Sequence, residues 1–295
     1  MGSMDERAAL RLLSDELAAA GDDAAIVDGL VVTTDMLHDR TDFPDGTTRY
    51  TAGWRAVGAS LSDIAAMGGS ATAAVAAYAA PTFDRDELLA FVRGARDVCE
   101  HVGAEYVGGD LDGHDEFTVS TTAIGRTADP VRRSGARPGD VVCVTGTLGR
   151  SGAALRLFDR DHTDRANDLF RFEPRIATGR TLAAHASAMM DSSDGLARSL
   201  HQLAEASDCG FAIDADRVPI ADAVHDVTDG DGDALEVATT FGEDFELVAT
   251  LPEDALPAVR DAAAVPLSVL GSVRDAADGI TMDGEALADR GYTHG

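Results

Sequence analysis

Aspartate residues recur where apolar segments of this chain begin or end. They stand in the short sequences GDDAA, TTDM, SLSD, GGD and DSSDG, as Asp22, Asp23, Asp35, Asp63, Asp110, Asp191 and Asp194. A carboxylate beside an apolar strand is partly buried and needs a partner. Carboxylates and hydroxyls such as those of Thr33 and Thr34 are hard oxygen ligands that suit Mg²⁺. Each aspartate alone is explained by solvation, but the set favours a metal site.

A magnesium site of this kind indicates chemistry on phosphates. An acidic protein can bind ATP if Mg²⁺ bridges its carboxylates to the phosphate groups. Gly108 and Gly109 stand directly before Asp110. Because glycine carries no side chain, backbone N–H groups at these positions could approach a phosphate closely.

The charge balance of the chain excludes several partners. Of its 295 residues 45% are hydrophobic, and 52 acidic against 24 basic residues give a net charge of −28. Such a chain repels nucleic-acid phosphates and anionic lipid surfaces, so we expect neither nucleic acid nor membrane as a partner. All the basic residues are arginine. This acid-rich, lysine-free composition suggests a halophilic protein kept soluble in concentrated salt.

Several common sites are excluded by residues that the sequence lacks. Without lysine there is no P-loop, no protein-kinase strand lysine and no Schiff-base catalyst. Cys99, Cys143 and Cys209 are far apart and match no zinc spacing, and their odd number predicts a reduced, cytoplasmic protein. No apolar run approaches the length of a membrane span. Residues 229–240, DGDGDALEVATT, imitate a calcium loop without its glycine and glutamate, and we interpret them as an acidic surface loop.

Hydrophobic periodicity predicts two α/β domains, residues 4–134 and 135–295, joined at the turn-rich segment 132–140. We expect a hairpin over 25–34 that turns at Asp28 and Gly29. Further strands are expected over residues 71–80, 104–109, 117–126, 141–145, 211–213, 245–251 and 267–273. Helices are expected over residues 6–20, 50–67, 84–102, 149–158, 175–186 and 255–264, with another ending at 206. The first half mixes strands and helices as a split βαβ sheet does.

The helix predicted over residues 50–67 has two distinct faces. Its apolar stripe consists of Trp54, Val57, Leu61, Ile64 and Met67. Asp63 lies off this stripe, among small residues that let another group approach the helix closely.

The order and spacing of many short motifs resemble those of thiamine-monophosphate kinases. The motifs are GDDAAIV, TTDML, SLSDIAAMG, VGGD, RSGARPGD, VTGTLG, DSSDGL, ASDCG and FGEDFEL, and GYTHG at the end resembles the family's terminal Gly-Tyr segment. The resemblance implies an α/β (α+β) PurM-like two-domain fold, with a ferredoxin-like N-terminal domain and an α/β C-terminal domain. It also implies a homodimer whose N-terminal sheets join, and ATP-dependent phosphorylation of thiamine monophosphate to thiamine diphosphate.

The resemblance assigns roles residue by residue. It implies that several Mg²⁺ ions are held by Asp22, Thr33, Thr34, Asp35, Asp63, Asp110, Asp191 and Asp194. It implies that ATP contacts Gly109, Asp110, Arg133 and Ser193, and that Glu243 faces the thiamine substrate. We expect Asp35, Asp63 and Asp194 to act most directly in a direct in-line transfer without a phosphoenzyme, because this reaction needs alignment and charge neutralisation.

The sequence departs from the family pattern at two positions. Asp42 stands where the family has a substrate-contacting histidine, and we predict that Asp42 takes part in substrate binding; His38 is nearby. Val102 stands where the family has a tyrosine, so an adenine contact is either absent or supplied by His101.

Four alternatives arise at the level of sequence. Another PurM-like enzyme, such as aminoimidazole ribonucleotide synthetase, would share the fold. A selenophosphate synthetase needs a reactive cysteine near the N-terminus, and a hydrogenase-maturation relative needs one at the C-terminus; neither is present. A non-catalytic acidic domain that binds divalent ions is the alternative outside enzymes.

Overall fold

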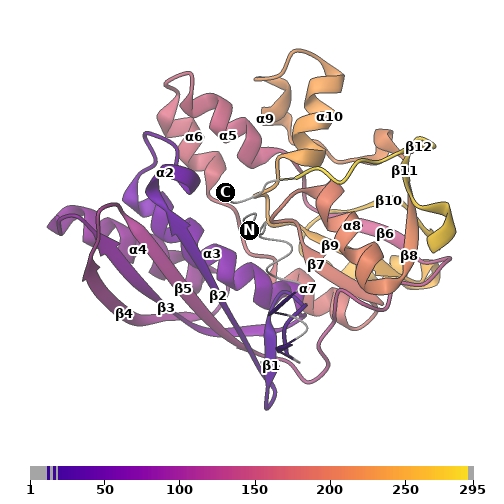
Figure 1. Ribbon diagram of the computed structural model, residues 1–295, viewed down its shortest axis with the longest axis horizontal. Helices are drawn as coiled ribbons and strands as arrows, with labels where there is room; N and C mark the ends of the chain where they lie inside the picture. Colours follow the sequence, from indigo (N-terminus) through magenta and orange to yellow (C-terminus); the bar gives the residue numbers. More distant parts are fainter. Residues whose placement is uncertain (1–11, 14–15, 18, 292–295) are drawn as a thin grey trace.

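The computed structural model describes residues 12–13, 16–17 and 19–291 of the chain. The helix predicted over 6–20 and the segment 292–295 fall largely outside the described residues. Two β-sheets lie side by side with helices between and around them (Figure 1). The first contains strands from residues 25–126 and the second contains strands from residues 141–286, so the predicted division near residue 135 falls between them.

The strands of the first sheet are β1 Ala25–Val27, β2 Leu30–His38, β3 Ser70–Ala80, β4 Glu105–Gly113 and β5 Thr118–Arg126. The strands of the second sheet are β6 Val141–Thr145, β7 Ala188–Asp191, β8 Cys209–Ile213, β9 Leu247–Leu251, β10 Leu267–Asp275, β11 Ile280–Met282 and β12 Glu285–Ala286. The helices are α2 Asp39–Asp42, α3 Arg49–Ala66, α4 Arg85–His101, α5 Arg150–Phe158, α6 Thr163–Phe170, α7 Ile176–Ala183, α8 Leu196–Ser207, α9 Asp222–His225, α10 Asp231–Thr240 and α11 Leu256–Ala262, with 3-10 turns at Ala215–Arg217, Glu253–Ala255 and Ala276–Asp278.

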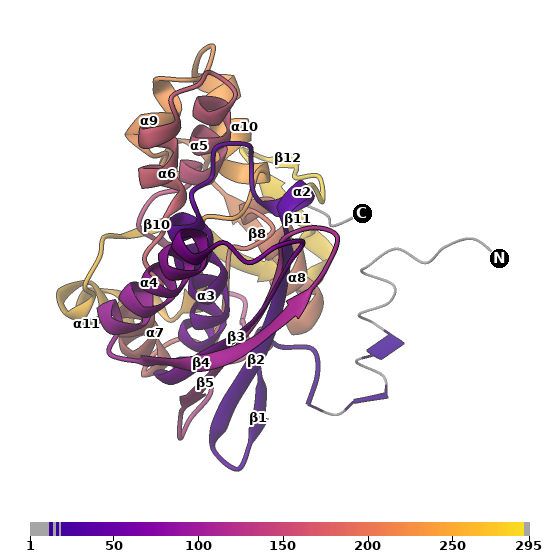
Figure 2. The ribbon, with the colours of Figure 1, turned by 90° about the vertical axis from the view of Figure 1, so that its left-hand side faces the viewer.

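The first sheet has the order β1-β2-β5-β3-β4. Strand β5 is antiparallel to both β2 and β3, so β2 and β3 run parallel with β5 between them, as a split βαβ unit requires. Helices α3 and α4 cover one face of this sheet (Figure 2). The opposite face exposes apolar side chains that include Met36, Val75 and Ile124, and we call it the open face.

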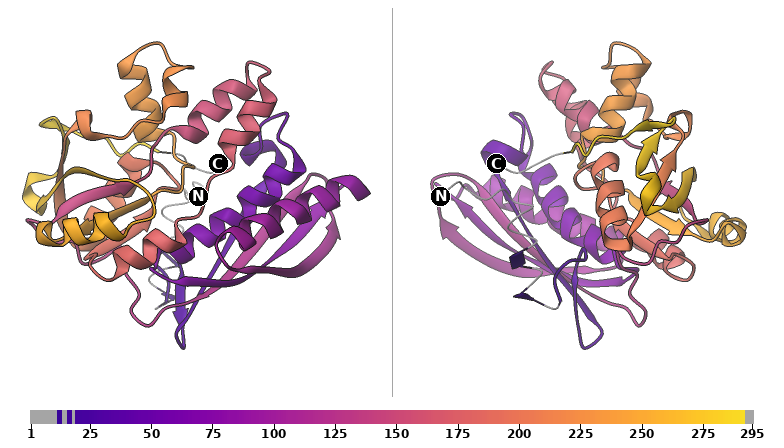
Figure 3. Two further views of the ribbon diagram at one scale, coloured as in Figure 1. Left: turned by 180° about the vertical axis from the view of Figure 1, so that it is seen from behind. Right: turned by 45° about the vertical axis from the view of Figure 1, so that its right-hand side comes forward.

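The second sheet has the order β12-β11-β8-β10-β6-β9-β7 and is antiparallel except between β8 and β11. Strand β7 is its edge nearest the first domain, and α3 packs against both β7 and α7 (Figure 3). A Cβ added to Gly179 of α7 would lie 2.3 Å from the carbonyl oxygen of Ala65 in α3. The glycine therefore permits the close approach of these two helices.

Helix α3 is the central element of the molecule. Its predicted stripe is correct but too narrow, because 14 of its 18 residues are buried. On the α4 side, a Cβ at Gly53 would lie 2.2 Å from the carbonyl oxygen of Phe91, so the backbones are nearly in contact. Asp63 is among the few residues of α3 that keep some exposure. The helix therefore presents one carboxylate from an otherwise buried surface.

One predicted element is wrong. Residues 229–240 do not form a loop; most of them form α10. Ala234, Val237 and Ala238 are buried on one face of this helix, and Asp233 accepts two hydrogen bonds from Arg156 at 2.6 Å. The aspartates suggested a solvated loop, but Asp231 and Asp233 occupy the first helical turn, where acidic side chains interact favourably with the helix dipole. In the part of the chain that the structure describes, no helix is long and apolar enough to cross a membrane.

Candidate active site

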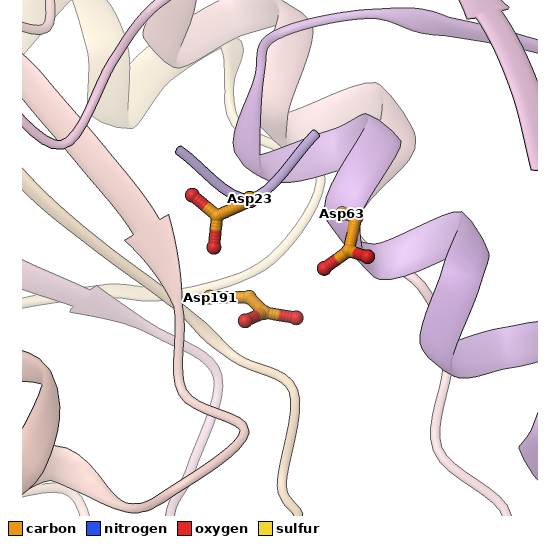
Figure 4. Close-up of side chains that lie close together, drawn as sticks. All are labelled: Asp23, Asp63 and Asp191. Atoms are coloured by element: carbon orange, nitrogen blue, oxygen red, sulfur yellow. The ribbon is translucent and has the colours of Figure 1, made fainter. Parts of the chain in front are cut away.

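Three carboxylates from distant parts of the sequence converge at one point. Asp23 comes from the segment before β1, Asp63 from α3 and Asp191 from the end of β7. One oxygen of each lies within 4.8 Å of the others (Figure 4). Strand and helix ends thus bring three hard oxygen donors together, and this donor set fits a divalent ion such as Mg²⁺.

The electrostatics of this carboxylate cluster are unfavourable without a cation. Burial raises the pKa of Asp63 well above its usual value, and the charges of Asp35, Asp191 and Asp23 raise it further. Burial, with a contribution from Asp23, also raises the pKa of Asp191 to about 8. Like charges brought together in a buried place favour protonation or a bound cation. The cluster therefore has the properties of a metal site.

Hydroxyl groups hold the carboxylates in place. Thr33 Oγ1 donates to Asp63 Oδ2 at 2.5 Å, and Ser62 Oγ donates to Asp191 Oδ2 at 2.6 Å. Ser60 Oγ donates to Asp35 Oδ2 at 2.6 Å, which fixes Asp35 on β2 close to Asp63. Hydroxyls of one turn of α3 therefore orient Asp35 and Asp191, and a hydroxyl of β2 orients Asp63.

Asp22 and Asp23 have different environments. The side chain of Asp23 is fully buried, belongs to the cluster and accepts from Arg133 Nη2 at 2.9 Å. Asp22, which we predicted as a ligand, instead accepts from Arg132 Nη1 at 2.6 Å and from the backbone N–H of Arg133 at 3.0 Å. The structure thus adds Asp23 to the candidate ligands, while the role of Asp22 remains a prediction. It places Arg133, predicted to bind ATP, at the edge of the cluster.

Three predicted residues lie away from the cluster within one chain. Thr34 lies on the open face, because side chains alternate along β2, and its hydroxyl donates to the carbonyl of Thr121 at 2.8 Å. Asp110 is exposed on β4, and three strand spacings, roughly 14 Å, separate β4 from β2. Gly109 lies inside β4, where a Cβ would be 1.7 Å from the carbonyl oxygen of Ala76. Strand packing alone explains this glycine, and the three predicted roles remain predictions.

The DSSDG and FGEDFEL motifs lie side by side. The N–H of Ser192 donates to the carbonyl of Glu246 at 2.8 Å, that of Glu243 to Ser193 at 2.6 Å and that of Phe245 to Ser192 at 3.3 Å. These paired segments carry Asp191, Ser193 and Asp194 on one side and Glu243 on the other. Gln202 donates to Asp194 at 3.5 Å. The backbone pairing connects the carboxylate cluster with the residue predicted to bind substrate.

Glu243 opens onto a pocket of about 480 Å³. Asp42 lines the same pocket, so the two residues predicted to bind substrate meet there. The buried carboxylate of Asp42 accepts from the backbone N–H of His38 at 2.7 Å. The other lining residues are Arg40, Thr41, Phe43, Pro44, Asp45, Leu155, Phe158, Asp159, Asp161, Phe170 and Phe241. Five acidic residues against one arginine suit a cationic ligand, and the aromatic rings suit a flat one.

Each acidic residue of FGEDFEL has a different partner. Glu243 pairs with Arg55, a fully buried arginine of α3 that sequence reasoning missed. Asp244 accepts from the N–H groups of Gly149 and Ser151 at the start of α5, at 2.5 and 2.9 Å. Burial raises the pKa of Asp244 to about 6 despite these bonds. Glu246 receives two hydrogen bonds from Arg175, at 2.8 and 2.5 Å.

Comparisons with known proteins agree with this architecture. Residues 21–127 match the family described as AIR synthase related protein, N-terminal domain, and residues 137–283 match AIR synthase related protein, C-terminal domain. The fold and the site therefore define a two-domain protein of the AIR synthase related class, which confirms the predicted PurM-like fold.

The chain is similar along its full length to one branch of this class. It is 66% identical to the thiamine-monophosphate kinase of the halophile Halobacterium salinarum, over 99% of this chain and 100% of that protein. It is 40% identical to the thiamine-monophosphate kinase of Methanospirillum hungatei, over 99% of both chains. The chain belongs to the thiamine-monophosphate kinase family. A solved structure, AaThiL complexed with AMPPCP and TMP, superposes with a TM-score of 0.90 at 27% identity and covers 100% of this chain and 99% of that one.

Proposed function

We propose that this chain phosphorylates thiamine monophosphate with ATP to give thiamine diphosphate. The observation that carries the proposal is the backbone pairing of two segments, one of which contributes Asp191 to the carboxylate cluster and the other Glu243 to an acidic, aromatic pocket. The cluster suits metal-bound phosphates, and the pocket suits a cationic ring such as a thiazolium. Two thiamine-monophosphate kinases that are similar to this chain over nearly its full length support this assignment.

The protein's own groups would act by positioning and by neutralising charge. Asp23, Asp35, Asp63 and Asp191 would hold Mg²⁺, which supplies positive charge between the phosphates of ATP and of the acceptor. Arg133, paired with Asp23, would lie near the same phosphates. Glu243 and Asp42 would hold the organic part of the acceptor. The oxygen of the acceptor phosphate would attack the γ-phosphorus of ATP as the bond to ADP breaks, without a phosphoenzyme.

Substrate choice provides the direct test of this proposal. We expect ADP release with thiamine monophosphate and negligible release with free thiamine, whose hydroxyl places the nucleophile one phosphate too short for in-line attack. A coupled ADP assay in molar KCl with Mg²⁺ would measure both rates, with an aminoimidazole precursor as a third acceptor. Comparable rates for thiamine and its monophosphate would contradict the geometry. Turnover of the aminoimidazole precursor alone would favour the synthetase alternative, and no turnover at all would favour a non-catalytic metal-binding domain.

We also propose that two copies of the chain associate through the first sheet. The open face exposes Met36, Val75 and Ile124, and the edge strand β4 exposes Val107 and Leu111. Exposed apolar side chains on the open face of a highly charged protein support a protein–protein contact. A cytoplasmic location remains a prediction.

The dimer can be tested by light scattering coupled to size-exclusion chromatography in molar KCl. We expect the mass of two chains for the wild type and of one chain for Met36→Asp/Ile124→Asp, because two buried carboxylates are costly at an apolar contact. Asp112→Asn, a change on the same edge strand that adds no charge, is the control and should remain dimeric. A monomeric wild type would rule out the contact.

A further inference from the structure

We propose that Arg55 is the positioning residue that sets the orientation of Glu243 in the substrate pocket. This inference rests on the proposed function and extends it to a residue outside every motif used to recognise the site. Arg55 does not line the pocket. It would act on the acceptor only through the groups that it holds.

The guanidinium of Arg55 is deeply buried and makes bonds in several directions. Its side chain is 1% exposed. Nη2 donates to Glu243 Oε2 at 2.5 Å and to the backbone carbonyl of Glu243 at 3.0 Å. Nη1 donates to the carbonyl of Phe170 at 2.7 Å, and the guanidinium lies over the Phe170 ring, 3.6 Å from its centroid. Both Glu243 and Phe170 line the pocket, so one cation fixes two of its walls.

The backbone of Glu243 explains why it needs such support. Its φ is +62°, in the left-handed region that non-glycine residues rarely adopt. Ser151 Oγ donates to the same carbonyl of Glu243 at 2.6 Å, and the N–H of Glu243 donates to Ser193. Arg55, Ser151 and the paired segments thus hold a strained residue in one conformation. Strain of this kind persists where the surroundings over-determine the geometry, as in a preorganised binding site.

The hydrogen bond from Arg55 also makes the two oxygens of the Glu243 carboxylate different. Oε2 accepts from the guanidinium, whereas no residue in the described part of the chain donates to Oε1. The side chain is 15% exposed and borders the pocket. Oε1 is therefore the oxygen that could accept a hydrogen bond from a ligand such as the aminopyrimidine of the acceptor.

Arg55 also relates the pocket to the carboxylate cluster. It stands eight residues before Asp63 on α3, so about 12 Å of rigid helix separates their backbones. Helix α3 thereby supports both ends of the acceptor, its ring through Arg55 and Glu243 and its phosphate through Asp63. A fixed separation of this kind aligns the reacting groups.

Arg55→Met and Arg55→Lys test this role in the full-length enzyme. We expect Arg55→Met to raise the KM and the calorimetric Kd for thiamine monophosphate at least about tenfold, as Glu243→Gln should, because a charge-assisted bond is misdirected. The KM for ATP should change less than about twofold. Lysine keeps the charge but cannot make the same set of bonds. The KM of Arg55→Lys for thiamine monophosphate should therefore lie between those of the wild type and of Arg55→Met.

Arg175→Met is the matched control. Arg175 is also a buried arginine bonded to a glutamate, Glu246, but it does not line the pocket. We expect Arg175→Met to lower Tm as Arg55→Met does, with both KM values nearly unchanged. The double variant Arg55→Met/Glu243→Gln removes the unpaired buried charge, so it should recover Tm while the KM for thiamine monophosphate stays high.

The outcomes separate this inference from the proposed function. Equal shifts of both KM values in Arg55→Met, or the same acceptor-specific shift in Arg175→Met, would reduce Arg55 to a structural residue. If Arg55→Met does not fold, the KM values of Arg55→Lys and of the double variant for thiamine monophosphate and for ATP provide the same test. Failure of the wild type to bind thiamine monophosphate in the titration would overturn the proposed function and this inference with it. Normal wild-type binding with unchanged binding by the Arg55 variants would overturn the inference alone.

Discussion

Asp63→Asn is expected to lower kcat for thiamine monophosphate by at least about a hundredfold, the scale of losing one main electrostatic stabiliser of a transition state. The same variant should be more stable than the wild type when Mg²⁺ is absent. The raised pKa of Asp63 has burial as its main cause, with repulsion from Asp35, Asp191 and Asp23, so the ionised side chain destabilises the metal-free fold above that pKa. Asparagine removes the charge and can still accept from Thr33.

Steady-state kinetics and thermal unfolding with EDTA would measure both effects. Asp28→Asn is the control. Asp28 has a φ of +52° in the β1–β2 turn, and asparagine adopts this conformation readily. Near-normal turnover of Asp63→Asn at saturating Mg²⁺ would show that Asp63 is not part of the metal site.

Magnesium binding is expected to release protons and to strengthen steeply with pH. The pKa of Asp191 is raised to about 8, mainly by burial, so Asp191 holds a proton near neutral pH when no metal is bound, and burial also raises the pKa of Asp63. These raised values stabilise the metal-free fold at low pH, and that stabilisation is lost as the pH rises through about 8. Bound Mg²⁺ requires the ionised carboxylates, so its affinity should rise by up to about tenfold per pH unit for each proton displaced.

Calorimetric titration with Mg²⁺ at pH 6, 7 and 8, in buffers that differ in ionisation enthalpy, would count these protons. The increase in Tm caused by Mg²⁺ should also be larger at pH 8 than at pH 6. A magnesium affinity that does not change over this range would mean that the cluster is already ionised without metal, or that Mg²⁺ binds elsewhere.

Hydrophobic periodicity was sufficient to predict most elements of this fold. The β1–β2 hairpin turns at Asp28 and Gly29 as expected, and β6 has the predicted bounds. Helix α10 was missed because its first turn is rich in aspartate, and in so acidic a chain charge does not distinguish a helix start from a loop. The burial of α3 on its second side could not be predicted, since that side is covered by α7 and β7 of the other domain.

The sequence was sufficient to predict many residues of the candidate site but not how they are arranged in space. Adjacent Asp22 and Asp23 are equivalent in sequence, and only the folded chain directs one to the cluster and the other to Arg132. Arg55 lies on a helix face whose other residues predict a buried core. No neighbouring residue in the sequence indicates its pairing with a glutamate 188 residues later. Such pairings depend on how the domains pack, which periodicity does not report.

The pairing of DSSDG with FGEDFEL has a consequence for how this chain can vary in length. Three main-chain hydrogen bonds fix the register between Asp191 and Glu243, independently of the side chains present. One residue inserted or deleted in either segment would shift the carboxylates relative to the pocket by about 3.3 Å, comparable to the separation of the reacting atoms. In the exposed turn at Gly103, where a Cβ would meet nothing within 4 Å, a change of length leaves that register untouched.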